Sequence, residues 1–432
     1  MSVLQAQHLY KVFGRRPDEV VKRLEEGADP AELREKYDVT PAVIDASFDV
    51  REGEIFVVMG LSGSGKSTLI RMLNGLHPAT SGKVLIHGED ISTMSGAQLR
   101  KTRSEHISMV FQHFALFPHR TVLQNAAYGL KIKGLKESER NKKAREALSM
   151  VGLDGWADHK PGELSGGMQQ RVGLARALAA ETDIMLMDEA FSALDPLIRR
   201  DMQDQLIELQ QKLGKTIVFI THDLNEAMRI GDRIAMMRNG RIVQIGTAEE
   251  ILTDPANDYV AQFIADVDRT RVLTAGSIME PPVATLGLGN GPKAAHKMMR
   301  EHQQAGLYVV SRDRTLQGYV MEETVAANRE LPTIESLVEP IETAVSVDEQ
   351  AAHLFTPAAN VRLPLPVVDA DNKLRGVIPR VTLLAALGQV DSHETTRVVE
   401  IDDVPAPSAG EEVHSGNSAT DLLTKTTMGE DR

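Results

Sequence analysis

The sequence predicts an α/β fold with a mostly parallel sheet, followed by a smaller α+β region. Over residues 1–268, short apolar runs alternate with longer helical patterns, as in 54–60 followed by 66–76. Strands that alternate with helices favour a parallel sheet. A glycine-rich loop joins this strand to this helix, and two similar halves follow within 277–390. We therefore expect a large α/β domain and a smaller repeated region.

Composition limits the classes of protein to which the chain can belong. Its 432 residues leave room for two or three domains. The formal net charge of −13 argues against a nucleic-acid binder that works by broad phosphate neutralisation, so we expect no nucleic-acid partner. Because the chain has no cysteine, disulfides, thiolate metal sites and cysteine nucleophiles are excluded.

No segment has the pattern of a signal peptide or a membrane span. Residues 1–16 lack an apolar core of signal-peptide length. The longest apolar runs, such as 184–187 and 217–220, have the length of strands and are too short to cross a bilayer. We expect a soluble chain that reaches any membrane process by docking to a partner.

The loop from Gly60 to Ser67 fits the pattern G-x-x-x-x-G-K-[ST], which holds nucleotide phosphates. Glycines let the backbone curl so that several N–H groups point at the phosphates, and the following helix adds its positive dipole end. An accidental match in a Gly-Ser turn is disfavoured by the strand before the loop and the helix after it. The loop predicts ATP and Mg²⁺ as ligands, with Lys66 on the phosphates, Ser67 on the metal, and nucleotide contacts from Gly60, Leu61, Ser62, Gly63, Ser64, Gly65, Lys66, Ser67 and Thr68.

Two carboxylates, Asp188 and Glu189, follow directly after the apolar run 184–187. A carboxylate at a strand end beside such a loop can hold Mg²⁺, and the next one can orient or deprotonate the attacking water. Two acids at this position can also do no more than cap the strand, but the phosphate loop favours the catalytic interpretation. We predict Asp188 as a metal ligand and Glu189 as the catalytic base.

Residues 164–171, Leu-Ser-Gly-Gly-Met-Gln-Gln-Arg, resemble the LSGGQ signature of ABC ATPases. In that family the serine hydroxyl and the glycine amides form a second phosphate-binding surface, which completes the site of a partner subunit. The resemblance implies that Ser165, Gly166 and Gly167 contact the nucleotide across a homodimer. Met168 stands where the family usually has Gln, and we expect this difference to be tolerated.

Three further residues match motifs of the same family, in the order found in its import branch. Gln112 matches the Q-loop, which ligates Mg²⁺ and senses the transporter subunit. Asp195 matches the D-loop that crosses the dimer interface, and His222 matches the switch histidine that holds the γ-phosphate. The resemblance thus implies a catalytic set of Glu189, His222, Lys66 and Gln112, and a metal-binding set of Ser67, Gln112 and Asp188.

Adenine needs an aromatic face on which to stack. Phe13 occupies the position usual for this role in the family, and Tyr10 is its nearest competitor. A core role for Phe13 on the first strand is the alternative. We predict Phe13 as the adenine contact.

A helical insertion at 15–43 makes the resemblance more specific. Together with the motifs above, it closely resembles the ATPase of glycine betaine/proline betaine importers, the ProV type. The halves 277–330 and 337–390 each contain a Glu-Pro pair, a short helix, two strands and a closing helix. This repeat looks like the tandem CBS domains that the same family carries at its C-terminus.

The resemblance implies a P-loop ABC ATPase domain over 1–268, with a RecA-like core, an antiparallel β subdomain and a helical subdomain. Two copies would close on ATP beneath transmembrane permease subunits, peripheral to the cytoplasmic face of the inner membrane. An extracytoplasmic substrate-binding protein would deliver an osmoprotectant quaternary ammonium compound for import. Paired CBS domains in general hold adenine nucleotides or sense ionic strength, so 277–390 is implied to be regulatory.

Two alternatives stay open at this point. The cargo can be another amino acid or amine, because other subunits bind it. A soluble, non-transport ABC ATPase is a different class, disfavoured by the single ATPase unit, the lack of long heptad repeats and the acidic balance.

The last residues, 391–432, are polar and show no periodicity. They carry ten acidic and three basic residues, a net charge of −7. Such a composition cannot bury enough apolar surface to fold. We therefore predict a disordered acidic tail.

Overall fold

The computed structural model describes residues 2–112, 114–265 and 269–387. Its largest sheet has six strands in the order β10-β9-β3-β8-β7-β6. All neighbours from β9 to β6 are parallel, and β10 pairs antiparallel with β9 at one edge. The strands are β3 (Ile55–Met59), β6 (Ile107–Val110), β7 (Ile184–Asp188), β8 (Thr216–Thr221), β9 (Arg233–Arg238) and β10 (Arg241–Gly246).

Strand β3 shows why this sheet is covered on both faces. All five of its residues are buried. Ile55, Val57 and Met59 belong to one hydrophobic cluster, and Phe56 and Val58 belong to a second one. Because successive side chains of a strand point to opposite faces, an unbroken apolar run matches a parallel sheet that is buried on both sides.

An antiparallel sheet contributes to the second cluster, with the strand order β2-β1-β4-β5. Helix α3 (Lys66–Leu73), which follows the phosphate loop, adds its apolar side chains from Leu69 to Leu73 to the same cluster. The loop is therefore anchored between two sheets. The strands of this sheet are β1 (Ser2–Phe13), β2 (Thr40–Arg51), β4 (Ser81–Ile86) and β5 (Glu89–Asp90).

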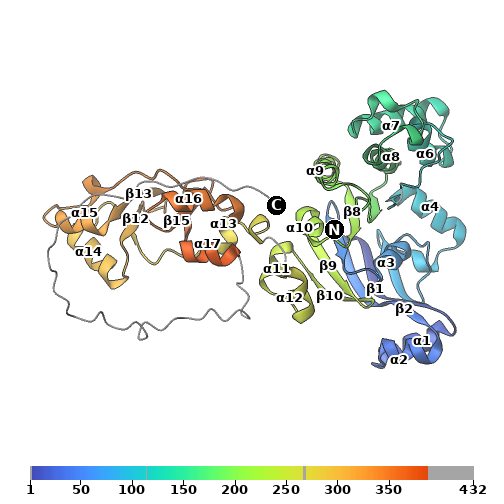
Figure 1. Cartoon of the computed structure of the whole chain (residues 1–432), viewed down its shortest axis with the longest axis horizontal. Helices are drawn as coiled ribbons and strands as arrows, with labels where there is room; N and C mark the ends of the chain where they lie inside the picture. Colours follow the sequence, from blue (N-terminus) through green and yellow to red (C-terminus); the bar gives the residue numbers. More distant parts are fainter. Residues whose placement is uncertain (1, 113, 266–268, 388–432) are drawn as a thin grey trace, which may run out of the picture. The chain divides into compact units, whose positions relative to one another are not determined.

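Helices supply most of the first cluster. Between β6 and β7, the helices α6, α7 and α8 gather in a helical part of the molecule (Figure 1), where α8 packs against α5, α6 and α7. The helices of the ATPase region are α4 (Gly96–His106), α5 (Val122–Ala126), α6 (Tyr128–Ile132), α7 (Glu137–Met150), α8 (Gly166–Ala179), α9 (Pro196–Leu213), α10 (Leu224–Ile230), α11 (Ala248–Thr253) and α12 (Asp258–Ile264).

Two further helices lie between β1 and β2, where the sequence predicts a helical insertion. They are α1 (Pro17–Glu25) and α2 (Pro30–Tyr37). Each begins with a proline, which suits the first helical position because its fixed φ is helical and its missing N–H has no intrahelical partner there. Their apolar faces form a separate cluster with side chains of β1 and β2. Since β2 begins at Thr40, the last residues of the predicted 15–43 insertion lie in this strand.

The C-terminal part contains two three-stranded sheets of the same design, β11-β12-β13 and β14-β15-β16. In each sheet the first pair of strands is parallel and the second pair is antiparallel. The elements are α13 (Ala275–Ile278), β11 (Thr285–Leu286), α14 (Pro292–Glu301), β12 (Gly306–Val310), β13 (Leu316–Met321), α15 (Glu322–Ala327), β14 (Val345–Ser346), α16 (Phe355–Asn360), β15 (Leu365–Val368), β16 (Leu374–Ile378) and α17 (Arg380–Leu387).

The two halves exchange their leading segments. The backbone of Glu280 pairs with Val377 of β16, and the backbone of Glu339 pairs with Tyr319 of β13. A Cβ atom added to Gly318 would lie 2.3 Å from Val338 Cγ1, and one added to Gly376 would lie 2.7 Å from Met279 Sδ. The Glu-Pro pair and the glycine that recur in both halves of the sequence therefore serve the same close backbone approach twice.

These observations confirm the predicted α/β fold with its mostly parallel sheet. Within the described ranges, no helix combines the length and the apolar character needed to cross a membrane. The acidic tail predicted at 391–432 lies outside the described residues. The assignment of 277–390 to CBS domains stays a prediction.

Candidate active site

The phosphate loop adopts a backbone that only glycine tolerates at its key positions. Gly60, Gly63 and Gly65 have φ values of 151°, 79° and 105°. A Cβ atom at Gly60 would lie 2.2 Å from the carbonyl oxygen of Met237, and one at Gly65 would lie 2.2 Å from that of Ala42. Left-handed φ values and close backbone neighbours both require glycine here, so the loop is shaped by its surroundings as well as by its sequence.

A turn far along the chain braces this loop, and the sequence analysis did not identify it. The Gly240 N–H donates to the Ser64 carbonyl at 3.0 Å, and the Gly240 carbonyl accepts from Ile44 N–H at 2.8 Å. Asn239 and Gly240 both have positive φ, as a tight hairpin turn demands. The Asn-Gly pair is a strong turn signal, but nothing in the sequence indicates that this turn contacts the phosphate loop.

Lys66, at the start of α3, is held inside the loop. Its side chain is buried, with the residue only 4% exposed. The ammonium donates to the Gly60 carbonyl at 2.8 Å and the Leu61 carbonyl at 3.1 Å, and it lies 3.9 Å from Glu189 Oε1. Burial lowers the pKa of Lys66, against the opposing effect of the carboxylates of Glu189 and Asp188. Because its partners are mainly neutral carbonyls, the buried charge of Lys66 is only partly compensated, which favours binding of an anionic ligand.

The other loop side chains differ in exposure. Leu61 and Ser62 are exposed, and Thr68 is half-buried. The Ser64 hydroxyl is buried and has no hydrogen-bond partner in the described part of the chain. An unpaired buried hydroxyl is uncommon and costs free energy, so Ser64 fits a loop that awaits a polar ligand.

Asp188 ends strand β7 next to Ser67. The Ser67 hydroxyl donates to Asp188 Oδ1 at 3.1 Å, and Arg71 lies 3.9 Å from Oδ2. Burial raises the pKa of Asp188, while the Ser67 hydrogen bond and the Arg71 charge lower it. A hydroxyl and a carboxylate side by side are oxygen ligands of the kind that Mg²⁺ prefers. The residues present therefore fit the predicted metal, and Arg71 is a neighbour that the sequence analysis missed.

Glu189 is the point at which three separate segments meet. Its Oε2 lies 3.1 Å from His222 Nδ1 and accepts from Gln112 Nε2 at 3.4 Å. Its backbone has a φ of 45°, held by its N–H bond to the Ile220 carbonyl at 3.0 Å. The sequence predicts each of these side chains separately, and the fold brings them together on one carboxylate.

Ser192, the first residue of the Ser-Ala-Leu-Asp run that matches the D-loop, links the same segments. Its hydroxyl donates to the Glu189 carbonyl at 2.9 Å and accepts from Gln112 Nε2 at 3.3 Å. Arg199 of α9 holds the residues that follow, through the carbonyls of Ser192 and Leu194. The loop that ends in Asp195 is thus tied to the carboxylate cluster.

The aromatic candidates separate clearly. Tyr10 is buried in the cluster formed with α1 and α2, so its ring is not available for stacking. Phe13 is 39% exposed at the end of β1. Its ring lies 5.8 Å from the His77 ring and 5.0 Å from Lys11 Nζ. Of the two candidates, only Phe13 offers a ring to solvent.

The signature residues and Asp195 lie on other elements. Ser165 caps α8 by accepting from Met168 N–H at 3.3 Å, and Asp195 caps α9 by accepting from Ile198 N–H at 3.1 Å. Within the described chain, neither Ser165 nor Asp195 makes a hydrogen bond or ion pair with residues 60–68. The Met168 side chain packs against the hydrophobic cluster, which explains how it can replace a polar residue.

Known proteins are similar to this chain over most of its length. A family model described as "ABC transporter" matches residues 43–192. The glycine betaine/carnitine transport ATP-binding protein GbuA of Listeria monocytogenes is 48% identical over 90% of this chain and 98% of its own length. The glycine betaine transport ATP-binding protein OpuAA of Bacillus subtilis is 47% identical over 89% of this chain and 92% of its own length.

The glycine betaine/proline betaine transport system ATP-binding protein ProV of Salmonella typhimurium is 48% identical over 89% of this chain and 97% of its own length. These similarities extend well beyond the ATPase motifs, because they cover most of the chain. The motif residues come together in the fold. The phosphate loop holds a buried lysine, Ser67 donates to Asp188, and Glu189 lies within hydrogen-bond reach of His222. The chain belongs to the family of ABC transporter ATP-binding proteins and has their P-loop α/β fold.

Proposed function

We propose that this chain hydrolyses ATP to power the import of an osmoprotectant quaternary ammonium compound through a partner permease. The observation that carries the ATPase activity is the meeting of Lys66, Gln112 and His222 at Glu189, beside Ser67 and Asp188. Membership in the family supports coupling to transport. The cargo rests on the relatives, whose names give glycine betaine, carnitine and proline betaine.

The phosphate loop binds the triphosphate in this proposal. The amides of Gly60–Thr68 surround the phosphates, and Lys66 exchanges its carbonyl partners for phosphate oxygens. Ser67, Asp188 and Gln112 would hold Mg²⁺, which offsets phosphate charge when bound. Phe13 stacks on the adenine.

Glu189 acts as the general base. A water oxygen attacks the γ-phosphorus, Glu189 accepts a proton from this water, and the bond between phosphorus and the bridging oxygen breaks to release ADP. His222 and Gln112, both within hydrogen-bond reach of Glu189 Oε2, fix the position of the carboxylate. His222 also reaches the γ-phosphate, as the switch histidine of the family does.

A second copy of the chain completes each site. Ser165, Gly166 and Gly167 sit at the N-terminus of α8, a suitable place for a phosphate oxygen. Since Ser165 makes no polar contact with residues 60–68 within the described chain, we assign this surface to the ATP bound by the partner. Asp195 belongs to the same interface. The homodimer closes on two ATP molecules and reopens after hydrolysis.

The remaining assignments concern partners and domains. We place the homodimer beneath transmembrane permease subunits, on the cytoplasmic face of the inner membrane, with an extracytoplasmic binding protein that delivers the cargo. The ATPase domain is 1–268, and the halves 277–330 and 337–390 form a regulatory tandem CBS pair that takes an adenine nucleotide or senses ionic strength. The exchanged segments at Glu280 and Glu339 support a single paired unit.

Uptake by the reconstituted complex tests the proposal. The chain is combined with its permease and binding protein in proteoliposomes, and uptake of labelled glycine betaine, choline and proline is measured with and without internal ATP at two ionic strengths. ATP-dependent betaine uptake is the expected result. Uptake of a different amine alone would replace the cargo, and failure to co-purify with any polytopic membrane subunit would favour a soluble ABC ATPase.

A further inference from the structure

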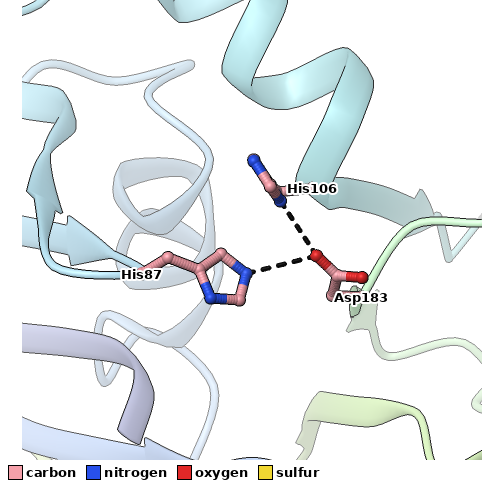
Figure 2. Close-up of side chains that lie close together, drawn as sticks. All are labelled: His87, His106 and Asp183. Atoms are coloured by element: carbon pink, nitrogen blue, oxygen red, sulfur yellow. Dashed lines mark hydrogen bonds and ion pairs between the residues drawn. The ribbon is translucent and has the colours of Figure 1, made fainter.

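Two histidines and an aspartate converge at a place that the ATPase reaction does not use. His87 Nε2 lies 3.2 Å from Asp183 Oδ2, and His106 Nδ1 lies 2.9 Å from the same oxygen. Figure 2 shows both rings turned toward this one carboxylate. The three ligand atoms all lie within 4.8 Å of one another. The cluster therefore gathers two imidazole nitrogens and a carboxylate oxygen around one point.

Three different elements present these side chains. His87 lies in the turn between β4 and β5, with a φ of 49°, and His106 is the last residue of α4. Asp183 directly precedes β7. The cluster thus joins the antiparallel sheet to the six-stranded sheet. It lies at the amino ends of β6 and β7, whereas Gln112, Asp188 and Glu189 lie at or beyond their carboxyl ends. Since a strand rises about 3.3 Å per residue, the two sites are separated by the length of a strand.

The donor set selects a class of metal. Two imidazoles and one carboxylate suit Zn²⁺ and similar transition metals, while Mg²⁺ prefers oxygen ligands. Tetrahedral Zn²⁺ with bonds of about 2.0–2.1 Å places neighbouring ligand atoms roughly 3.3 Å apart. The two nitrogen-to-oxygen distances already lie near this value. The two nitrogens need to approach each other by rotation of rings that are exposed or half-exposed.

The charges around the cluster permit a cation. Asp183 supplies the negative charge of the cluster, and its side chain is 54% exposed. Two lysine ammonium groups donate to backbone carbonyls of residues that precede Asp183 in the chain. Lys133 Nζ donates to the Ala180 carbonyl at 2.7 Å, and Lys215 Nζ donates to the Thr182 carbonyl. In the described part of the chain, neither of these two lysines forms a hydrogen bond or ion pair with Asp183.

We propose that His87, His106 and Asp183 form a binding site for a divalent transition metal ion of the Zn²⁺ class, with water completing the coordination. The bound ion joins the β4–β5 turn to the start of β7 and to the end of α4. It therefore stabilises the contact between the two sheets. This site is separate from the nucleotide site and does not depend on hydrolysis.

Metal binding to the purified full-length chain tests this proposal. The protein is stripped with a chelator, and Mg²⁺ and a non-hydrolysable ATP analogue are kept in excess so that the nucleotide site is filled. Zn²⁺ binding is measured by calorimetry, and Co²⁺ binding by its visible absorption bands. We expect one equivalent per chain and a higher melting temperature with Zn²⁺. Loss of a residue that supports a metal ligand weakens metal binding roughly tenfold or more. Removing one ligand itself should therefore weaken Zn²⁺ binding by at least about tenfold.

Three variants and one control make the outcome decisive. His87→Asn suits the left-handed backbone of that turn, while His106→Gln and Asp183→Asn keep side-chain size. Each variant should lose the tightly bound equivalent of Zn²⁺ and the Zn²⁺-dependent rise in melting temperature. His8→Ala is the matched control, since it removes the histidine of an exposed pair whose Nδ1 lies 2.7 Å from Asp45 Oδ1. The proposal would be overturned if wild-type protein bound no equivalent of Zn²⁺, or if the site variants bound Zn²⁺ like wild type. The cluster would then be only a set of hydrogen bonds between the two sheets.

Discussion

At the scale of single residues, Glu189 organises the candidate active site. It follows a buried strand and has a left-handed backbone, with a φ of 45°. Backbone conformations of this kind cost free energy and cluster at functional sites. Glu189 contacts the ammonium of Lys66 and the side chains of Gln112 and His222. One residue therefore connects the phosphate loop with the two segments that carry Gln112 and His222.

The variant Glu189→Gln should separate binding from hydrolysis. The amide keeps the size of the side chain but cannot accept the proton of the attacking water, so turnover should fall by about 10²-fold or more. ATP affinity should be retained and the ATP-bound dimer should persist longer. Steady-state ATPase rates, nucleotide binding and size-exclusion chromatography measure these three effects. Glu181→Gln is the control, because Glu181 is exposed and pairs with Lys143 on the surface. Wild-type turnover in Glu189→Gln would remove Glu189 from the role of base.

Asp188 should leave a signature in the pH dependence of stability. Burial raises its pKa, so the folded, nucleotide-free chain holds this proton more tightly than the unfolded chain does. The free energy of unfolding therefore falls as the pH rises through this raised pKa. Because Asn stays neutral, Asp188→Asn should melt at a higher temperature than wild type at pH about 7. This gain should shrink below the ordinary Asp pKa of about 4.

Thermal unfolding of nucleotide-free wild type and Asp188→Asn, at pH about 7 and at a pH below about 4, measures the gain in melting temperature. Asp201→Asn is the control, because Asp201 is exposed on α9 and lies away from the candidate site in the sequence. A gain of equal size at both pH values, or a lower melting temperature at neutral pH, would contradict the assigned effect of burial.

At the scale of elements, the repeated region depends on two glycines. Gly318 and Gly376 admit the leading segment of the opposite half, since a Cβ atom at either position would meet atoms less than 3.0 Å away. The sequence shows the repeat of glycine and Glu-Pro, and only the pairing of Glu280 with β16 and Glu339 with β13 shows why they recur together. The repeat of glycine and Glu-Pro can be seen in the sequence of each half, but its cause is a backbone contact between the two halves.

Replacement of Gly318 by Ala should destabilise the repeated region. The added methyl group meets Val338 Cγ1 at 2.3 Å and the Glu339 carbonyl at 2.5 Å, so a segment must move. Overpacking of this kind costs about 1–3 kcal/mol. Thermal unfolding and protease sensitivity of the region after residue 273 measure the loss. Gly289→Ala is the control, because nothing lies within 4 Å of a Cβ atom there. Equal effects of both substitutions would mean that the exchanged segments are not tightly packed.

At the scale of the whole molecule, each ATP site is shared between two chains in our proposal. The phosphate loop and the start of α8 belong to separate elements, and the described structure shows no polar contact between Ser165 and residues 60–68. A site divided in this way allows ATP to act as the contact that closes the dimer. Its hydrolysis then removes that contact.

Complementation between inactive chains tests the shared site. One chain carries Lys66→Ala and the other carries Ser165→Asp, which keeps a good helix cap but repels phosphate. In the assembled complex, a mixed dimer has one intact site, so ATPase activity should exceed that of either variant alone. The control combines both substitutions in one chain and pairs it with wild type, which leaves no intact site in the mixed dimer. If each site were complete within one chain, the first mixed dimer would have no intact site and the control would keep one, so higher activity in the control would contradict the shared site.

Much of this protein follows from local sequence. The alternation of strands and helices, the glycine loop and the acidic strand end each depend on neighbouring residues, so the α/β fold and the candidate residues could be predicted. The sequence favoured Phe13 over Tyr10 only through the family resemblance, because the burial of Tyr10 depends on the packing of α1 and α2. The links made by Ser192 and Arg71 were not predicted, since their partners lie elsewhere along the chain.

The sequence by itself determined the class of fold, the phosphate loop and the residue types that the ATPase chemistry needs, because backbone preferences and strand periodicity act over a few residues. Only the tertiary structure decided that Gly240 braces Ser64, that Gln112 and His222 meet at Glu189, and that His87, His106 and Asp183 converge. These contacts join residues far apart in the chain. Their geometry is set by the packing of whole sheets and helices, which no local pattern encodes.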